Sequence, residues 1–210
     1  IKNIWGCNIK FIDLHSQYKK IKSNIDRDIL SILDKGDFIL GEKVYKLEKK
    51  LAKYANVKEC ITCASGTDAL LIPLIANNIS FGDAVFTTNF SFFATSEVIS
   101  HIGATPVFVD VDKQTFNISP DLLEIEIKRV IKEGKLRPKA IIAVDLFGQL
   151  ADYQKIKKIA DKFDLFLIED AAQSFGASFK DMKSCSFGDV AATSFYPAKP
   201  LGCYGDGGAI

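Results

Sequence analysis

The chain has 210 residues, of which 48% are hydrophobic and 25% charged, and its formal net charge is +1. This profile is typical of a globular protein with one large domain. The near-neutral charge gives no electrostatic basis for binding nucleic acid or an anionic membrane surface. No apolar run approaches the length of a membrane span, and the first residues lack the pattern of a secretory signal. We therefore expect no nucleic-acid partner and no membrane partner.

Two amphipathic helices are predicted at residues 21–33 and 44–54, where apolar residues recur at three- and four-residue spacing. The pattern changes after them. We expect residues 1–56 to form an N-terminal helical segment and residues 57–210 to form the main domain.

Short apolar runs alternate with helical patterns from Cys60 onward. Runs without polar alternation, separated by helices, predict an α/β fold with a mostly parallel sheet and helices on both faces. The predicted strands are 60–64, 84–88, 105–109, 140–144, 165–168 and 190–195, and the predicted helices are 68–75, 93–102, 120–131 and 153–162.

The last residues, Gly207 to Ile210, look like the start of a further strand. Because a domain normally ends on the surface after a completed element, we expect a truncated chain that lacks a second, smaller lobe.

The five cysteines are Cys7, Cys60, Cys63, Cys185 and Cys203. An odd number argues against a complete disulfide framework. The Cys-x-x-Cys of Cys60 and Cys63 lies in a strand-like run with no second ligand pair after it. We expect free thiols, no metal site and the reducing cytosol as the compartment.

Ligands of open α/β sheets bind beyond the carboxyl ends of the strands, so the residues that follow each predicted strand are candidates for a site. Ser65, Gly66 and Thr67 follow the first strand and open a helix. Free backbone N–H groups, hydroxyls and the positive end of the helix dipole make such a turn an anion site. Ordinary helix capping is the alternative.

Three aromatic residues, Phe90, Phe92 and Phe93, follow the second strand. We expect two of them to lie in the core and one to face the site, where it can stack on a planar ring.

Glu169 and Asp170 end an apolar run, and buried acids need partners. Adjacent strand residues point to opposite faces, so one acid is expected to face the site. Asp170 is then placed to pair with a protonated heterocyclic nitrogen, and Gln173 to reach the same ligand. Alternatively, Asp170 caps the next segment.

Lys199 lies between Pro197 and Pro200, on a segment that begins at Ser194 and continues into a glycine-rich turn. The prolines fix φ and remove backbone donors, so this segment cannot continue as a regular helix or central strand. Lysine on such a loop is usually a solvated surface cation. A desolvated lysine instead loses its charge readily and can form a Schiff base.

An anion-binding turn, an aromatic side chain that can stack on a ring, a buried carboxylate and a lysine thus occur in the order expected for one ligand. That ligand has a phosphate, a flat ring, a ring nitrogen that needs a counter-charge, and an aldehyde. Pyridoxal 5′-phosphate has all four. The conjunction favours the Schiff-base role for Lys199 over a surface role.

The chain resembles the nucleotide-sugar aminotransferases of the DegT, DnrJ, EryC and StrS types, which are fold-type I pyridoxal-phosphate enzymes similar to aspartate aminotransferase. The resemblance covers nearly the whole chain from about residue 9, and its last two blocks are highly specific. The matching blocks are 38–41 with the helix that follows, 65–70, 103–110, 146–149, 168–177 and 194–210.

The resemblance implies a role for each candidate residue. Lys199 would hold the cofactor covalently and move the proton, and Asp170 would pair with the pyridinium nitrogen. The remaining cofactor-binding residues would be Gln173 on the ring hydroxyl, Phe92 stacked on the ring, and Gly66, Thr67 and Ser194 on the phosphate.

Residues 169–177 and 199–208 look closest to enzymes that aminate C3 of a UDP-linked 2-acetamido-3-keto-glucuronic acid. Such enzymes use glutamate as donor and serve bacterial surface-polysaccharide synthesis, as in lipopolysaccharide and O-antigen. The resemblance also implies a cytoplasmic homodimer with a shared active site and a small C-terminal domain. Residues 57–210 would be the cofactor-binding large domain, and we expect this chain alone to be impaired.

Three alternatives remain open within these patterns. One is a C4-specific nucleotide-sugar aminotransferase, and another is a non-catalytic regulatory member of the same family. A third, sugar dehydration, is disfavoured by Lys199, because relatives with that activity carry histidine there. A dehydrogenase is disfavoured because the first strand-to-helix turn lacks Gly-x-Gly-x-x-Gly.

Overall fold

The computed structural model describes residues 12–210, so Cys7 lies outside the described residues. The chain divides into two compact units, Ile1–Leu47 and Glu48–Ile210. The second unit contains every residue that the sequence proposes for the site.

The first unit contains helix α1 (Leu14–Lys35) and the start of α2 (Glu42–Ala55). Helix α1 begins earlier than its apolar pattern predicts because Asp13 caps it and accepts a hydrogen bond from the N–H of Ser16 at 3.2 Å. It ends at Gly36, whose φ of 67° is left-handed and costs glycine little.

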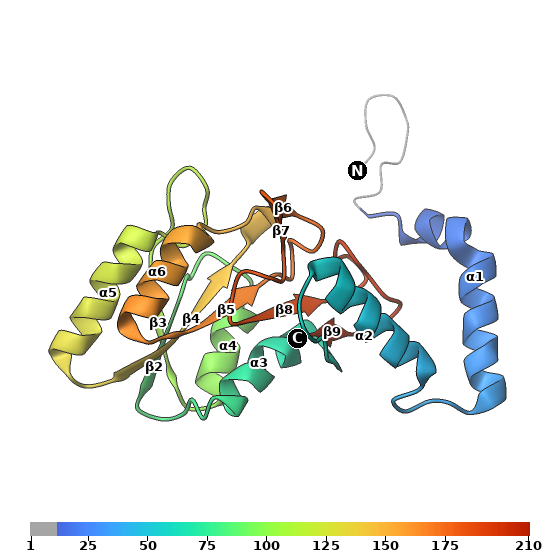
Figure 1. Ribbon diagram of the computed structural model, residues 1–210, viewed down its shortest axis with the longest axis horizontal. Coiled ribbons are helices and arrows are strands. Elements are labelled where there is room, and N and C mark those ends of the chain that lie inside the picture. Colours follow the sequence, from blue (N-terminus) through green and yellow to red (C-terminus); the bar gives the residue numbers. More distant parts are fainter. Residues whose placement is uncertain (1–11) are drawn as a thin grey trace. The chain divides into compact units, whose positions relative to one another are not determined.

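The second unit contains a seven-stranded sheet in the order β1-β9-β8-β5-β4-β2-β3 (Figure 1). Its pairs β2/β3, β2/β4, β4/β5 and β5/β8 are parallel, whereas β9 is antiparallel to both β1 and β8. The strands are β1 (Thr62–Cys63), β2 (Asp83–Thr87), β3 (Thr105–Phe108), β4 (Arg137–Val144), β5 (Phe166–Asp170), β8 (Val190–Ser194) and β9 (Gly208–Ala209).

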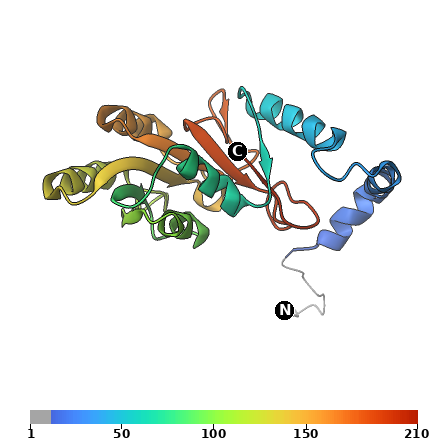
Figure 2. The same cartoon turned by 90° about the horizontal axis from the view of Figure 1, so that it is seen from below.

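Helices cover both faces of this sheet, as Figure 2 shows from below. Buried side chains of α5 (Pro120–Glu133) and α6 (Tyr153–Phe163) pack on one face, with Phe86, Ile141 and Leu167 from the strands. Helices α3 (Gly66–Ala76) and α4 (Ala94–His101) pack on the other face. Strands buried on both faces explain the continuous apolar runs of the sequence.

Two features of the strands differ from the sequence-based prediction. Strand β5 continues through Asp170, so Glu169 and Asp170 lie on the strand and not after it. A short hairpin, β6 (Ser178–Phe179) and β7 (Met182–Lys183), follows β5 and is absent from the prediction. Its strands are two residues long, too short to show a pattern in the sequence.

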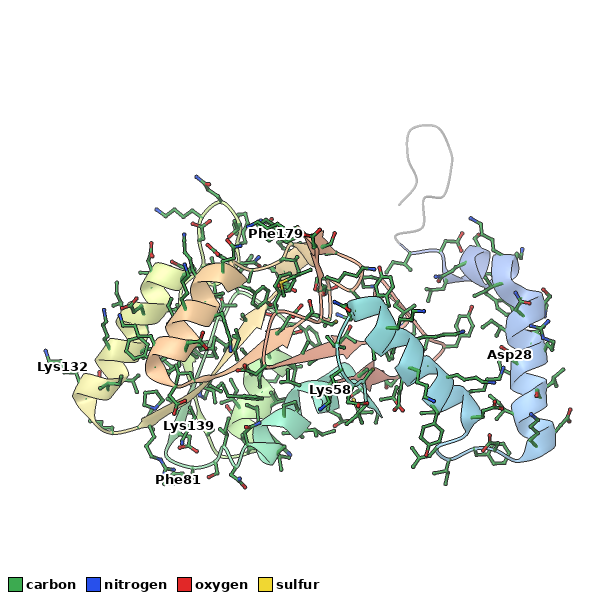
Figure 3. All side chains as sticks on the ribbon, viewed as in Figure 1. Asp28, Lys58, Phe81, Lys132, Lys139 and Phe179 are labelled. Carbon is green, nitrogen blue, oxygen red and sulfur yellow. The ribbon has the colours of Figure 1, made fainter. Side chains whose placement is uncertain are left out.

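The side chains in Figure 3 mark the two edges of the sheet. Phe81 and Lys139 lie near the edge where the parallel strands begin, and Phe179 lies on the hairpin beyond the edge where β5 ends. The candidate site belongs to the second of these edges.

Candidate active site

The amino end of α3 lies against the carboxyl end of β8. Ser65 caps the helix, accepting a hydrogen bond on its Oγ from the N–H of Asp68 at 3.0 Å. A Cβ on Gly66 would lie 2.5 Å from Cβ of Ser194, so only glycine allows this approach. The structure therefore brings together two of the predicted phosphate residues.

The first turn of α3 has polar groups available for an anion. The first backbone hydrogen bond of the helix runs from the N–H of Ala69 to the carbonyl oxygen of Ser65. The N–H groups of Gly66 and Thr67 therefore have no acceptor within the helix. The Thr67 hydroxyl has no hydrogen-bond partner among residues 12–210. The Ser194 hydroxyl accepts from the N–H of Tyr196 at 3.2 Å.

Asp170 is buried at the end of β5, with 5% of its surface exposed. The Thr95 hydroxyl donates to its Oδ2 at 2.8 Å, and the N–H of Ala172 donates to Oδ1 at 3.2 Å. Burial raises the pKa of this carboxyl, while the two hydrogen bonds and the charge of Lys199 act to lower it. The bond to Ala172 shows that Asp170 also caps the turn after β5.

Lys199 lies on the loop after β8 and is partly buried. Burial lowers the pKa of its amine, and the charge of Asp170 acts in the opposite direction. Its Nζ lies 6.0 Å from the ring centroid of Phe92. The lysine, the acid and the aromatic ring therefore come together from three segments distant in the sequence.

The prediction that two of the three aromatic residues lie in the core is wrong. Phe90, Phe92 and Phe93 are all exposed, because α4 turns Ala94, Thr95 and its later apolar residues inward instead. Phe92 is 74% exposed beside Lys199. Its position agrees with a residue that faces a ligand.

Gln173 has an exposed side chain on the turn that follows β5. The backbone carbonyl oxygen of Gln173 lies 3.1 Å from the position that a Cβ on Gly148 would take, and the φ of Gly148 is 85°. The turn after β5 therefore passes close to the connection between β4 and α6.

Thr95 is a site residue that sequence reasoning missed. It is 1% exposed, and its hydroxyl binds the carboxylate of Asp170. A threonine near the start of a helix is common and carries no signal of its own. Only the packing of α4 on the sheet identifies it.

The described cysteines are free thiols. Burial raises the pKa of Cys60 to about 11 and that of Cys185 to about 12, so both are protonated near neutral pH. Residues 12–210 contain no cluster of three or more potential metal ligands. None of the helices in this described part of the chain combines the length and the hydrophobicity of a membrane span.

The arrangement fits pyridoxal phosphate. The helix end and hydroxyls suit a phosphate, the buried carboxylate suits a protonated ring nitrogen, and the partly desolvated amine suits an aldehyde. The missing side chain at Gly66 lets the amino end of α3 lie directly against Ser194.

Comparison with known proteins decides the family. The profile of the DegT/DnrJ/EryC1/StrS aminotransferase family matches residues 19–210. The chain belongs to this family. The aminotransferase resemblance seen in the sequence and the fold-type I α/β class are thereby confirmed.

Three relatives illustrate the aminotransferase likeness. The UDP-2-acetamido-2-deoxy-3-oxo-D-glucuronate aminotransferase of Pseudomonas aeruginosa is 50% identical over 96% of this chain and 54% of its own. The structure of a family aminotransferase from Brucella abortus is 51% identical with a TM-score of 0.95, covering 96% of this chain and 54% of its own. That of ntda from Bacillus subtilis, with bound cofactor PMP, is 31% identical with a TM-score of 0.88, covering 100% and 46%.

The chain spans about half the length of the aminotransferases that it matches. The individual roles of the site residues, and the division at residues 56 and 57, stay predictions.

Proposed function

We propose that this chain carries the cofactor-binding part of a pyridoxal-phosphate-dependent nucleotide-sugar aminotransferase. The observation that carries the proposal is the convergence of Lys199, Asp170 and the amino end of α3 at one edge of the sheet. When bound, pyridoxal phosphate supplies an aldehyde that takes up an amino group and a ring that accepts electrons. Residues 57–210 are its proposed binding domain.

Gly66, Thr67 and Ser194 would bind the phosphate of the cofactor. The unpaired N–H groups of the first turn of α3 and the helix dipole favour the negative charge there. The hydroxyls of Thr67 and Ser194 add hydrogen bonds whose donors can rotate toward the phosphate oxygens.

Asp170 would keep the ring nitrogen of the cofactor protonated. A carboxylate in a buried position favours the positively charged partner strongly, because little water screens the pair. The hydroxyl of Thr95 supports this role by donating to the carboxylate and favouring its ionised form. Phe92 would cover the ring of the cofactor, and Gln173 would contact the ring hydroxyl.

Lys199 would hold the cofactor through its aldehyde carbon and would move the proton between the substrate and cofactor carbon atoms. Its amine must be neutral to act as nucleophile and base, and burial lowers its pKa toward that state.

The proposed substrate is the C3 keto group of UDP-2-acetamido-3-keto-glucuronate, with glutamate as amino donor. The named activity of the 50% identical relative supports it. We further propose a cytoplasmic homodimer that serves bacterial surface-polysaccharide synthesis.

The test is the half-reaction with glutamate. Addition of glutamate to the protein with pyridoxal phosphate should bleach the cofactor absorbance and form 2-oxoglutarate, and the keto-sugar should restore the absorbance. Product analysis by NMR distinguishes amination at C3 from amination at C4. No response to glutamate would count against the aminotransferase assignment.

A further inference from the structure

Two acidic side chains are buried together behind the candidate site. Asp145 and Glu169 are both 0% exposed, and Glu169 lies on the opposite face of β5 from its neighbour Asp170. The ion pairs of residues 12–210 all involve other acidic residues. Two uncompensated buried charges would be costly, so the pair needs a proton.

Two serines connect these acids. The Oγ of Ser174 lies 2.7 Å from Asp145 Oδ2 and 2.7 Å from the Oγ of Ser184. Ser184 Oγ lies 3.4 Å from Glu169 Oε1. A serine hydroxyl can donate in one direction and accept from the other, so the connection can be ordered either way.

The remaining hydrogen-bond partners of the two acids indicate which acid donates and which accepts. Glu169 accepts backbone N–H bonds on both oxygens, from Cys185 at 2.6 Å and from Phe187 at 2.8 Å. Both oxygens therefore act as acceptors, which favours the carboxylate.

Asp145 has a different set of partners. Its Oδ1 accepts from the N–H of Ala151 at 2.9 Å and from the hydroxyl of Tyr153 at 2.8 Å. Its Oδ2 lies 2.7 Å from the Oγ of Ser174, a hydroxyl that can accept a hydrogen bond as readily as it donates one.

We propose that Asp145 carries the proton of the pair and that Glu169 is a carboxylate, positioning the turn after β5 through Ser174 and Ser184. The hydrogen bonds then run from Asp145 through the two serines to Glu169. Ser174 follows Gln173 directly, and Ser184 follows the hairpin strand β7. This series of hydrogen bonds therefore fixes the turn that carries the proposed cofactor residues Asp170 and Gln173 relative to the hairpin. This positioning role rests on the proposed function.

The electrostatics of the pair agree with this order. Burial, followed by the charge of Glu169, raises the pKa of Asp145 from 3.8 to about 8. Burial also raises the pKa of Glu169, against hydrogen bonds from Phe187, Cys185, Ser184 and Asp145. Tyr153 from α6 and Cys185 are the other titratable groups that face the pair, and burial raises the pKa of each.

Two isosteric substitutions separate the acids. In Asp145→Asn, the amide oxygen keeps the bonds from Ala151 and Tyr153, and the amide N–H₂ donates to Ser174, as the proposed proton does. In Glu169→Gln, the N–H₂ group must face a backbone N–H donor. We expect Asp145→Asn to melt within about 2 °C of wild type at pH 7, and Glu169→Gln to melt roughly 5 °C or more lower.

The pH profile adds a second signature. A carboxyl whose folded pKa exceeds its unfolded pKa contributes stability that is present below pH 3.8 and is lost as the pH rises through about 8. In Asp145→Asn, this loss of stability between pH 3.8 and about 8 should be absent. In Glu169→Gln, which keeps the Asp145 carboxyl, stability should still fall as the pH rises.

The decisive experiment is carboxyl ¹³C NMR of the protein without cofactor, labelled on aspartate or on glutamate separately. A neutral carboxyl near pH 7 should occur in the aspartate sample and vanish in Asp145→Asn. A neutral carboxyl in the glutamate sample, or equal destabilisation by both substitutions, would overturn the proposal.

Cofactor affinity tests the positioning role separately. Glu169→Gln should weaken pyridoxal phosphate binding roughly tenfold, and Asp145→Asn by no more than about twofold. Equal affinities for the two variants would refute the positioning role. Failure of the wild type to bind would refute the proposed function, while the NMR result would still decide where the proton lies.

Discussion

At the scale of single residues, Lys199 and Asp170 act on each other's protonation. Burial lowers the pKa of the lysine, and the aspartate charge raises it. Asp170→Asn removes the charge, so the pKa of Lys199 should fall further. The measurement is a pH titration of the Lys199 side-chain ¹³C signal, identified by its loss in Lys199→Ala.

The matched control is Asp181→Asn, at an exposed position on the hairpin. It should leave the titration of Lys199 unchanged. A midpoint that stays the same or rises in Asp170→Asn would contradict the expected effect of the Asp170 charge on Lys199.

Thr95 provides a second prediction at this scale. Thr95→Val keeps the shape of the side chain but removes the bond to Asp170 Oδ2. A hydrogen bond to a charged group contributes about 1.5–3 kcal/mol, so cofactor affinity should fall roughly tenfold or more. Titration of pyridoxal phosphate by absorbance measures it.

Thr87→Val is the control for this substitution. Thr87 is equally buried, but its hydroxyl donates to the carbonyl of Ile142 in the sheet. An affinity loss of the same size in both variants would mean that Thr95 acts through general packing.

At the scale of elements, the contact between α3 and β8 sets the proposed phosphate site. Gly66→Ala would place a Cβ 2.5 Å from Cβ of Ser194 and force the helix end away. Overpacking of this kind costs about 1–3 kcal/mol. We expect a lower melting temperature and weaker pyridoxal phosphate binding, measured by thermal unfolding and absorbance titration.

Two further variants test the cause of that loss. Gly205→Ala, which meets nothing within 4 Å, should have little effect. Adding Ser194→Gly to Gly66→Ala should restore part of the stability. No recovery in the double variant would rule out the steric explanation.

Much of the element order was predictable from the sequence because the central strands β2, β4 and β5 are buried on both faces and most of the helices are amphipathic. The end of β5 was not predictable, because Glu169 and Asp170 are charged residues on a buried strand. Their partners, Thr95 and Cys185, come from distant segments. Sequence spacing proposed Lys199, Asp170 and Gly66 as neighbours, but not the bonds that hold them.

At the scale of the whole molecule, a ligand that binds only the folded chain must raise its melting temperature. A pyridoxal phosphate concentration of about 100 times Kd contributes roughly 2.7 kcal/mol, which corresponds to about 5–10 °C for a protein of this size. Thermal unfolding with and without the cofactor measures the shift.

Pyridoxal without its phosphate is the control ligand. It should give a smaller shift at the same concentration, because the amino end of α3 has no anion to bind. Equal shifts for the two compounds would contradict the proposed phosphate site.

The most direct test is to identify the lysine that captures the cofactor. The protein is incubated with pyridoxal phosphate, reduced with borohydride and digested, and the modified peptide is found by mass spectrometry. We predict that the added mass lies on Lys199 and that Lys199→Ala abolishes it. Labelling spread over surface lysines, or unchanged in Lys199→Ala, would contradict the assignment of this site.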